Sequence, residues 1–128
     1  QEHRQQRIGR EARKLDIYAR YLADHAHMRA QLRALAATSG LSGEERANEA
    51  RTAYTVCFGS HYELEVLAPQ SVLSRAQDLD SRARALRDVV AAGTNIQVHG
   101  TAPMQEYMDA MTLVRAAMRS DLGVADSA

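Results

Sequence analysis

The sequence predicts an all-α protein, an antiparallel four-helix bundle formed by a single domain of residues 1–128. Apolar residues recur at steps of three and four along four long segments, which is the spacing of one helical face. Turn and capping residues separate these segments, so the predicted helices cover residues 4–37, 43–68, 70–92 and 102–122. The connections between them are mostly short, which favours antiparallel neighbours.

The first predicted helix is the longest and ends at Thr38, Ser39 and Gly40. At about 1.5 Å per residue it would be about 50 Å long, so we expect its N-terminal end to project beyond the bundle. Its apolar residues predict one stripe that faces the core: Ile8, Ala12, Leu15, Tyr18, Ala19, Leu22, Ala26, Leu32 and Leu35.

The second predicted helix begins at a capping box, in which Ser42 accepts from a first-turn amide and Glu45 reaches back. Pro69 has no amide hydrogen and disfavours helical geometry at Ala68, so the helix should end or kink there. Its predicted core stripe is Ala47, Ala50, Tyr54, Cys57, His61, Leu64 and Ala68, widened by Val56, Phe58 and Leu67.

The third predicted helix ends at Gly93, and the fourth begins after Thr101. The stretch from Asn95 to His99 alternates like a strand but is too short to make a sheet, and residues 124–128 are expected to be a frayed tail. The third stripe is Val72, Ala76, Leu79, Ala83, Leu86 and Val90. The fourth is rich in methionine, which predicts core packing or, as an alternative, a groove for a peptide, ligand or subunit: Met104, Met108, Met111, Val114, Met118 and Leu122.

Composition limits the function classes. A single cysteine, Cys57, excludes an internal disulfide and favours an intracellular protein. The net charge of zero argues against a protein that wraps nucleic-acid phosphates. No segment approaches the roughly 20 apolar residues of a membrane span. Because the sequence starts at Gln1 directly in a helical pattern, we expect it to be part of a longer protein.

Two possible constellations of reactive side chains involve the second helix. Cys57, His61 and Glu65 are spaced four apart and could mimic a nucleophile, a base and an orienting acid. The middle of a helix offers no free backbone amides for an oxyanion, so we expect no enzyme. A second possibility is that His25, Cys57 and His61 converge as zinc ligands between the first two helices.

The simpler interpretation of these residues is a small core thiol beside a hydrogen-bonded histidine, with Tyr18 or Tyr54 as the partner. No Glu-x-x-His pair or Cys-x-x-Cys motif supports a metal centre, and we expect no cofactor. The remaining histidines have no comparable arrangement and are expected on the surface or in loops: His3, His27 and His99.

Positive charge is concentrated at the N-terminus, where only Glu2 and Glu11 oppose five basic residues: Arg4, Arg7, Arg10, Arg13 and Lys14. These charges suit the cytoplasmic flank of an upstream membrane segment and could touch anionic headgroups. They could also form a solvated helix face with pairs such as Arg7 and Glu11. Nucleic-acid binding is a weaker alternative, because no aromatic residues or reading motif accompany the arginines.

A resemblance rests on three segments of the sequence: LDIYARYLADHAHMRAQLRAL, RTAYTVCFGSHYELEVLAPQSVLSRAQDL and MTLVRAAMRSDLGV. In its tyrosine-containing first helix, its Ala-Pro break and its Asp-Leu-Gly ending, the chain resembles uncharacterised actinobacterial proteins. Those proteins typically join an N-terminal membrane segment to a cytoplasmic helical domain. The resemblance implies a membrane anchor and assigns no site residues.

The leading functional hypothesis is therefore a non-enzymatic interaction or scaffold domain, the cytosolic part of a membrane-tethered protein. It would act through helix-face contacts with a protein partner or a second copy. The alternatives are a bundle that binds a metal or small ligand and, less favoured, a nucleic-acid-binding protein.

Overall fold

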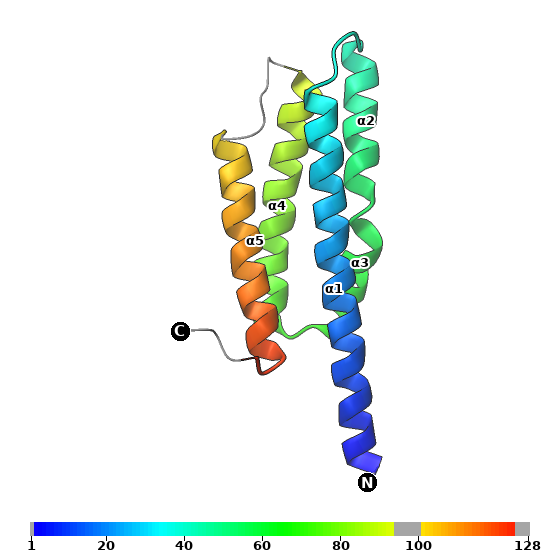
Figure 1. The fold of residues 1–128 in the computed structure, drawn as a ribbon, viewed down its shortest axis with the longest axis vertical. Coiled ribbons are helices and arrows are strands. Elements are labelled where there is room, and N and C mark those ends of the chain that lie inside the picture. The colour runs from blue at the N-terminus through cyan, green and yellow to red at the C-terminus, as the bar shows by residue number, and fades with distance from the viewer. Residues whose placement is uncertain (1, 94–100, 125–128) are drawn as a thin grey trace.

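The computed structural model describes residues 2–93 and 101–124, and every regular element in these ranges is helical. Figure 1 shows that α2 and α3 follow one another in line, and we call these two helices together the α2–α3 rod. When this rod is counted as one helix, the predicted all-α four-helix bundle is confirmed. The elements are α1 (Glu2–Ala36), α2 (Gly43–Thr55), α3 (Phe58–Leu67), α4 (Gln70–Ala92) and α5 (Ala102–Asp121).

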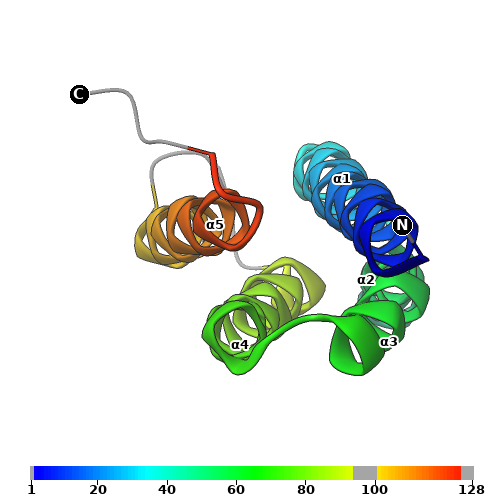
Figure 2. The ribbon, with the colours of Figure 1, turned by 90° about the horizontal axis from the view of Figure 1, so that it is seen from below.

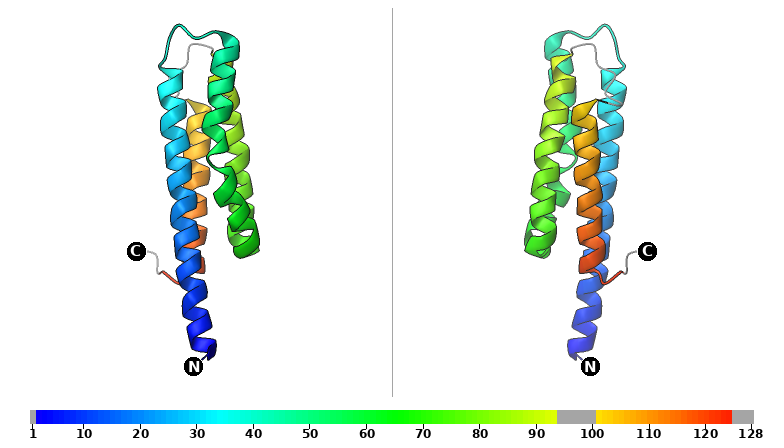
Figure 3. Two further views of the ribbon diagram at one scale, coloured as in Figure 1. Left: turned by 90° about the vertical axis from the view of Figure 1, so that its right-hand side faces the viewer. Right: turned by 90° about the vertical axis from the view of Figure 1, so that its left-hand side faces the viewer.

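The four rods alternate in direction around the bundle. Helix α4 packs against both α2 and α5, and α1 packs against α2 and α3. In the view along the bundle, α1 and α5 stand on one side, with α4 and the α2–α3 rod on the other (Figure 2). The N-terminal end of α1 extends past the other helices (Figures 1 and 3), as the length of the first predicted helix indicates.

The break at Pro69 is confirmed, but the second predicted helix is not continuous. Ala68 is extended, with φ −81° and ψ 146°, and α4 begins directly after Pro69. A tighter turn separates α2 from α3, because the Cys57 amide donates to Tyr54 O, three residues back, at 3.1 Å. The Thr55 hydroxyl donates to Thr52 O at 2.7 Å, and such bonds to the backbone bend helices.

The tight turn also changes which residues of the α2–α3 rod face the core. This turn has three residues per repeat instead of about 3.6, so the residues after it lie on a different face of the rod from the one that a continuous helix would give them. As a result Ser60 is buried and His61 is only half-buried. Val56 and Phe58, predicted to widen the core stripe, are exposed instead. The remaining members of the predicted stripe are buried or half-buried: Ala47, Ala50, Tyr54, Cys57, Leu64, Leu67 and Ala68.

Helix α1 carries two apolar stripes on different faces, and the single stripe predicted for the first helix contains residues of both. The inner face, which packs into the core, is Tyr18, Tyr21, His25, Met28, Leu32 and Leu35. The outer stripe is Ile8, Ala12, Leu15, Ala19, Leu22 and Ala26, of which only Leu22 is even half-buried. The prediction that these residues face the core is wrong for five of them, whereas the half-buried Leu22 packs against the edge of the core. Both stripes repeat every three or four residues, so spacing alone does not identify the one that is covered.

The remaining stripes agree with the prediction. All six predicted residues of α4 are buried, and in α5 Met104, Met111 and Met118 are buried, which confirms that these methionines pack in the core. Tyr107 and Ala110 are also buried, although they do not belong to the predicted core stripe. The predicted alternation at residues 95–99, the centre of the loop before Thr101 and the end of the tail lie outside the described residues.

The upper end of the bundle is fastened by Arg46. The predicted capping box is present, because the Glu45 amide donates to Ser42 Oγ and the Ser42 amide to Glu45 Oε1, each at 3.1 Å. The next residue, Arg46, donates to Leu35 O at 2.8 Å and to a second carbonyl just beyond α1. A Cβ on Gly93, whose φ is +67°, would lie 2.9 Å from Arg46 Cδ. Arg46 therefore packs against the ends of both α1 and α4.

Candidate functional site

His25 is the most deeply buried ionisable group among the residues proposed as ligands, with 1% of its surface exposed. Its Nδ1 lies 2.9 Å from the hydroxyl of Tyr107 on α5, and that hydroxyl is 3.4 Å from His25 O. The ring of Tyr21 packs beside it at 4.7 Å between centroids. Burial lowers the pKa of His25 to about 4, so the imidazole is neutral at neutral pH.

The thiol of Cys57 is an inert core group. It donates to Met28 Sδ at 3.8 Å, and the residue is 2% exposed. Burial is the main reason that the pKa of this thiol is raised to about 12, with smaller contributions from Asp24 and Asp80. Because the thiolate is the nucleophile and the metal-binding form, Cys57 is unreactive at neutral pH.

His61 belongs to a separate surface pair. Its Nε2 lies 3.1 Å from Glu65 Oε1, one helical turn further along α3. Its Nδ1 is buried and has no hydrogen-bond partner in the described part of the chain. Since the Cys57 thiol bonds to Met28 instead, the relay that the spacing of Cys57, His61 and Glu65 could mimic is not assembled.

The alternative in which His25, Cys57 and His61 converge as metal ligands is not supported either. Across residues 2–93 and 101–124, no three His, Cys, Asp or Glu side chains are grouped so that they could hold a metal ion. The three side chains do not meet because the face of α1 that packs into the core directs His25 Nδ1 towards Tyr107 of α5. The predicted hydrogen-bonded histidine is present, but its partner is neither Tyr18 nor Tyr54. The α1–α5 pairing has no signal in the sequence, because it depends on the register between two helices far apart in the chain.

The lower end of the bundle closes at Asp121. The Tyr18 hydroxyl donates to Asp121 Oδ2 at 2.6 Å, and Lys14 Nζ lies 3.2 Å from the same oxygen. Burial and the Asp121 carboxylate both raise the pKa of Tyr18. The Lys14 side chain is only 20% exposed, so Lys14 differs from the four arginines of the predicted basic group, which are exposed. Lys14 is where α1 first contacts another helix.

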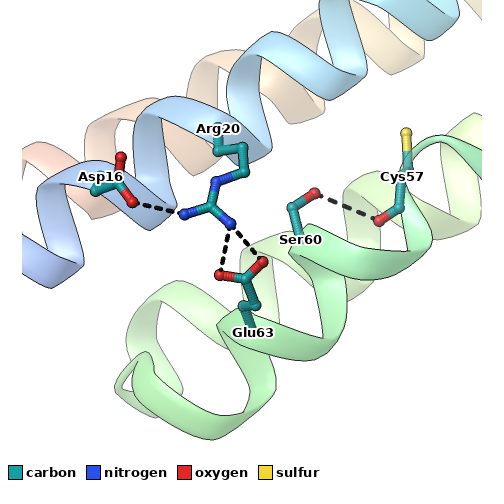
Figure 4. A network of polar contacts seen from close by, with 5 residues as sticks. All are labelled: Asp16, Arg20, Cys57, Ser60 and Glu63. Atoms are coloured by element: carbon teal, nitrogen blue, oxygen red, sulfur yellow. Dashed lines mark hydrogen bonds and ion pairs between the residues drawn. The ribbon is translucent and has the colours of Figure 1, made fainter.

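Arg20 fixes the next turn of α1 to α3. Its Nη1 donates to both carboxylate oxygens of Glu63, at 2.8 and 3.0 Å, and its Nη2 donates to Asp16 at 2.5 Å (Figure 4). The bond to Asp16 is the largest reason that the pKa of Arg20 is raised, followed by the charge of Glu63. Figure 4 also shows Ser60, whose hydroxyl donates to the carbonyl of Cys57 at 3.5 Å within α3. The pair of Arg20 with Glu63 therefore holds α1 against α3.

Residues 3–13 of α1, which we call the arm, lie below this closure and are all exposed. Its four arginines are Arg4, Arg7, Arg10 and Arg13, and none of them forms an ion pair within the described residues. The predicted pair between Arg7 and Glu11 is therefore absent there. With one glutamate, the arm carries a charge of +3. Because the whole chain is neutral, the remaining residues carry −3.

Two groups of large apolar side chains are exposed. On the outer stripe of α1, Ile8 is 61% and Leu15 is 59% exposed. On α3, a row of residues four apart is 46%, 64% and 87% exposed: Phe58, Tyr62 and Val66. The Phe58 ring still packs edge-on against Tyr54 at 5.3 Å, so part of this row belongs to the bundle. The outer stripe has no such support at its N-terminal end.

The histidines without a predicted role are also placed. His3 and His27 are exposed, as predicted, and His99 lies outside the described residues. No described helix is both long enough and apolar enough to cross a membrane.

Comparisons with protein-family models, with curated proteins and with solved structures give no match. The resemblance to membrane-anchored actinobacterial proteins therefore stays a prediction.

Proposed function

We propose that this chain is a non-enzymatic interaction domain whose docking element is the arm and the outer stripe of α1. The observation that carries the proposal is the arm itself. It continues α1 for eleven residues beyond the contact between Lys14 and Asp121, and every residue of it is exposed. Its apolar residue Ile8 and the nearby Leu15 lie on the same face of the helix, and each exposes more than half of its surface to water. Large apolar residues that share one exposed face indicate an interaction surface.

The physical argument concerns the stability of an isolated helix. Helices shorter than about 12–15 residues are marginal in water without tertiary contacts. Apolar residues that alternate at steps of three and four along one exposed face are the pattern by which helices pack onto other helices. A partner helix on the outer stripe would bury Ile8 and Leu15 and would give the arm the support that the bundle does not supply.

The interior of the bundle supports a non-enzymatic role. The groups that resemble catalytic residues serve other purposes, because His25 is paired with Tyr107 and the Cys57 thiol with Met28. Both residues are almost fully buried, and burial shifts their pKa values towards the neutral forms. Their packing stabilises the bundle, so the surface of α1 is the better candidate for function.

Site-specific photo-crosslinking tests this proposal. A photoreactive amino acid would replace Ile8 or Leu15 in the full-length protein in cells, with exposed Gln77 on α4 as the matched control position. We expect adducts from positions 8 and 15 that map to a helical segment of a protein, and none from position 77. No adduct from either position of the outer stripe, or equal adducts from position 77, would contradict the proposal.

A second part of the proposal is a membrane-tethered, cytosolic setting. The observation that favours it is the +3 charge of the arm, which projects from the end of the bundle with its arginines exposed. Basic residues next to a membrane gain about 1 kcal/mol each from anionic lipids. Flotation of the purified chain with anionic and with zwitterionic vesicles tests this directly.

In the flotation assay we expect binding only to the anionic vesicles, and loss of that binding when Arg7 and Arg10 are changed to glutamine. A matched pair of changes on the body, Arg75 and Arg115 to glutamine, should leave binding intact, because both residues are exposed but lie outside the arm. Equal recovery with both kinds of vesicle would remove the membrane from the proposal.

A further inference from the structure

The outer stripe of α1 alternates large and small side chains. It runs Ile8, Ala12, Leu15, Ala19, Leu22 and Ala26, so each large residue is followed by an alanine. We infer that this stripe pairs with the same stripe of a second copy, with the two α1 helices antiparallel across a two-fold axis. The inference rests on the proposed function and names its partner.

Side-chain size selects the antiparallel orientation. In a parallel pair, Leu15 would face Leu15 of the second copy, and Ala12 would face Ala12, so layers of two large side chains would alternate with layers of two alanines that leave space unfilled. In an antiparallel pair, layers join residues whose numbers have a constant sum. When that sum is 27, Ile8 faces Ala19 of the second copy, and Ala12 faces Leu15. The layers formed by Ile8, Ala12, Leu15 and Ala19 then each combine one large and one small side chain, which fills space evenly.

The shape of the monomer selects this register. The arm ends at residue 13, and the bundle begins at Lys14, which binds Asp121. With a sum of 27, residue 13 of one copy faces residue 14 of the other. Each arm therefore lies beside the bundle of its partner, and the two bundles stand end to end without overlapping. A register with a sum of 34 also pairs large with small residues, but it would place the two bundles beside each other over seven residues.

Charge favours the same arrangement. The arm carries +3 and residues 14–128 carry −2, so an antiparallel pair places each positive arm beside a negative body. In the chosen register Arg13 lies close to Asp16 of the second copy, and the Asp16 side chain is 71% exposed. A parallel pair would instead align the two positive arms, so that like charges repel.

Measurement of the mass in solution tests the pairing. The monomer mass is 14.1 kDa, and we expect sedimentation or light scattering to find twice this mass as the protein concentration rises. Leu15→Glu should weaken association by at least roughly 100-fold, because the carboxylate would lie in the apolar seam. Leu15 is exposed in the monomer, so the variant should keep the wild-type circular dichroism spectrum.

Val66→Glu is the matched control, because Val66 is an exposed apolar residue on α3, away from the outer stripe. It should associate as the wild type does. A wild type that stays monomeric at every concentration would overturn the inference. An unaffected Leu15→Glu variant would overturn it as well, and so would a Val66→Glu variant that alone dissociates.

Cysteine pairs test the orientation. We expect a mixture of Ala12→Cys and Leu15→Cys proteins to form a disulfide-linked heterodimer much faster than either protein alone. A parallel pair would instead cross-link each variant with itself, and that result would overturn the antiparallel arrangement. The native Cys57 is 2% exposed, so the wild-type protein should not cross-link and serves as the control.

The failure of this inference and the failure of the proposed function are distinguishable. Photo-adducts from positions 8 and 15 that map only to α1 of a second copy support both. Adducts to a different protein, together with a monomeric wild type, would end the inference and leave the interaction function. An antiparallel pair also places the two N-termini at opposite ends, so two tethered copies would lie with α1 along the membrane.

Discussion

The two parts of α1 form one uninterrupted helix but exist in different surroundings. From Lys14 to Ala36 the helix contacts α2, α3, α4 and α5 and buries its inner face. The arm, in contrast, is exposed along its whole length. Figure 3 shows the same rod passing from the bundle into solvent without a bend. The packed part is stabilised by tertiary contacts, and the arm only by its continuity with that part.

This difference separates stability from interaction along a single helix. Substitutions in the packed part should change the free energy of unfolding, because they remove buried contacts. Substitutions in the arm should leave that free energy almost unchanged and should act on association. The following four predictions test this separation, from the largest expected effect to the smallest.

Leu32→Ala should cost roughly 2–5 kcal/mol of unfolding free energy, because Leu32 is fully buried on the inner face and its removal leaves a cavity. Urea unfolding followed by circular dichroism measures this. Gln31→Ala is the matched control, because the neighbouring Gln31 is exposed and has only a long contact with His27. A loss below about 1 kcal/mol in Leu32→Ala would contradict the burial of the inner face.

His25 should make the stability fall in acid by up to about 3 kcal/mol. Its folded-state pKa of about 4 lies below its ordinary value of 6.5, so the unfolded chain binds more protons between these values. The stabilisation is complete above pH 6.5 and is lost as the pH falls towards 4. His25→Gln stays neutral, and the carboxylates titrate equally in both proteins. The wild type should therefore lose more unfolding free energy over this range, and equal losses would refute the prediction.

Arg46→Ala should cost about 1–2 kcal/mol, because two charge-assisted hydrogen bonds to Leu35 O and Thr38 O at the end of α1 disappear. Arg33→Ala is the matched control, because Arg33 is an exposed cation in the last turn of the same helix. Thermal unfolding should separate the two variants. If they melt together, Arg46 does not fasten the upper end of the bundle.

Ile8→Ser should change the unfolding free energy by less than about 0.5 kcal/mol, because Ile8 lies in the arm and is 61% exposed. The measurement belongs at a low protein concentration, where self-association does not add to the apparent stability. At high concentration the same variant should be less stable than the wild type. A large loss at low concentration would show that the arm packs on its own bundle.

The sequence predicted the helices well, because their ends are marked by local chemistry. Ser42 and Glu45 form the capping box that their spacing indicates, and the break at Pro69 follows from its missing amide hydrogen. The stripe of α4 was also predicted, since its flanks are polar and leave a single apolar face. The interruption at Cys57 was missed, because it depends on hydroxyl bonds that compete with the helix at Thr52 and Thr55.

The candidate site was predicted less well, because it depends on contacts between distant segments. The chemistry of His25 and Cys57 as core groups was anticipated, but their partners Tyr107 and Met28 were not. The position of the basic segment at the N-terminus was predicted, whereas Lys14 turned out to be bound to Asp121.

The sequence by itself determined the helical class, the caps and breaks, and the presence of a long basic first helix, since these depend on neighbours within one or two turns. The tertiary structure alone decided which stripe of α1 faces the core. Both stripes have the same period, and the stripe that is covered is the one whose large side chains, Tyr18, Tyr21 and Met28, reach partners on the other helices. That choice left Ile8 and Leu15 exposed, because a helix can turn only one face towards its own bundle.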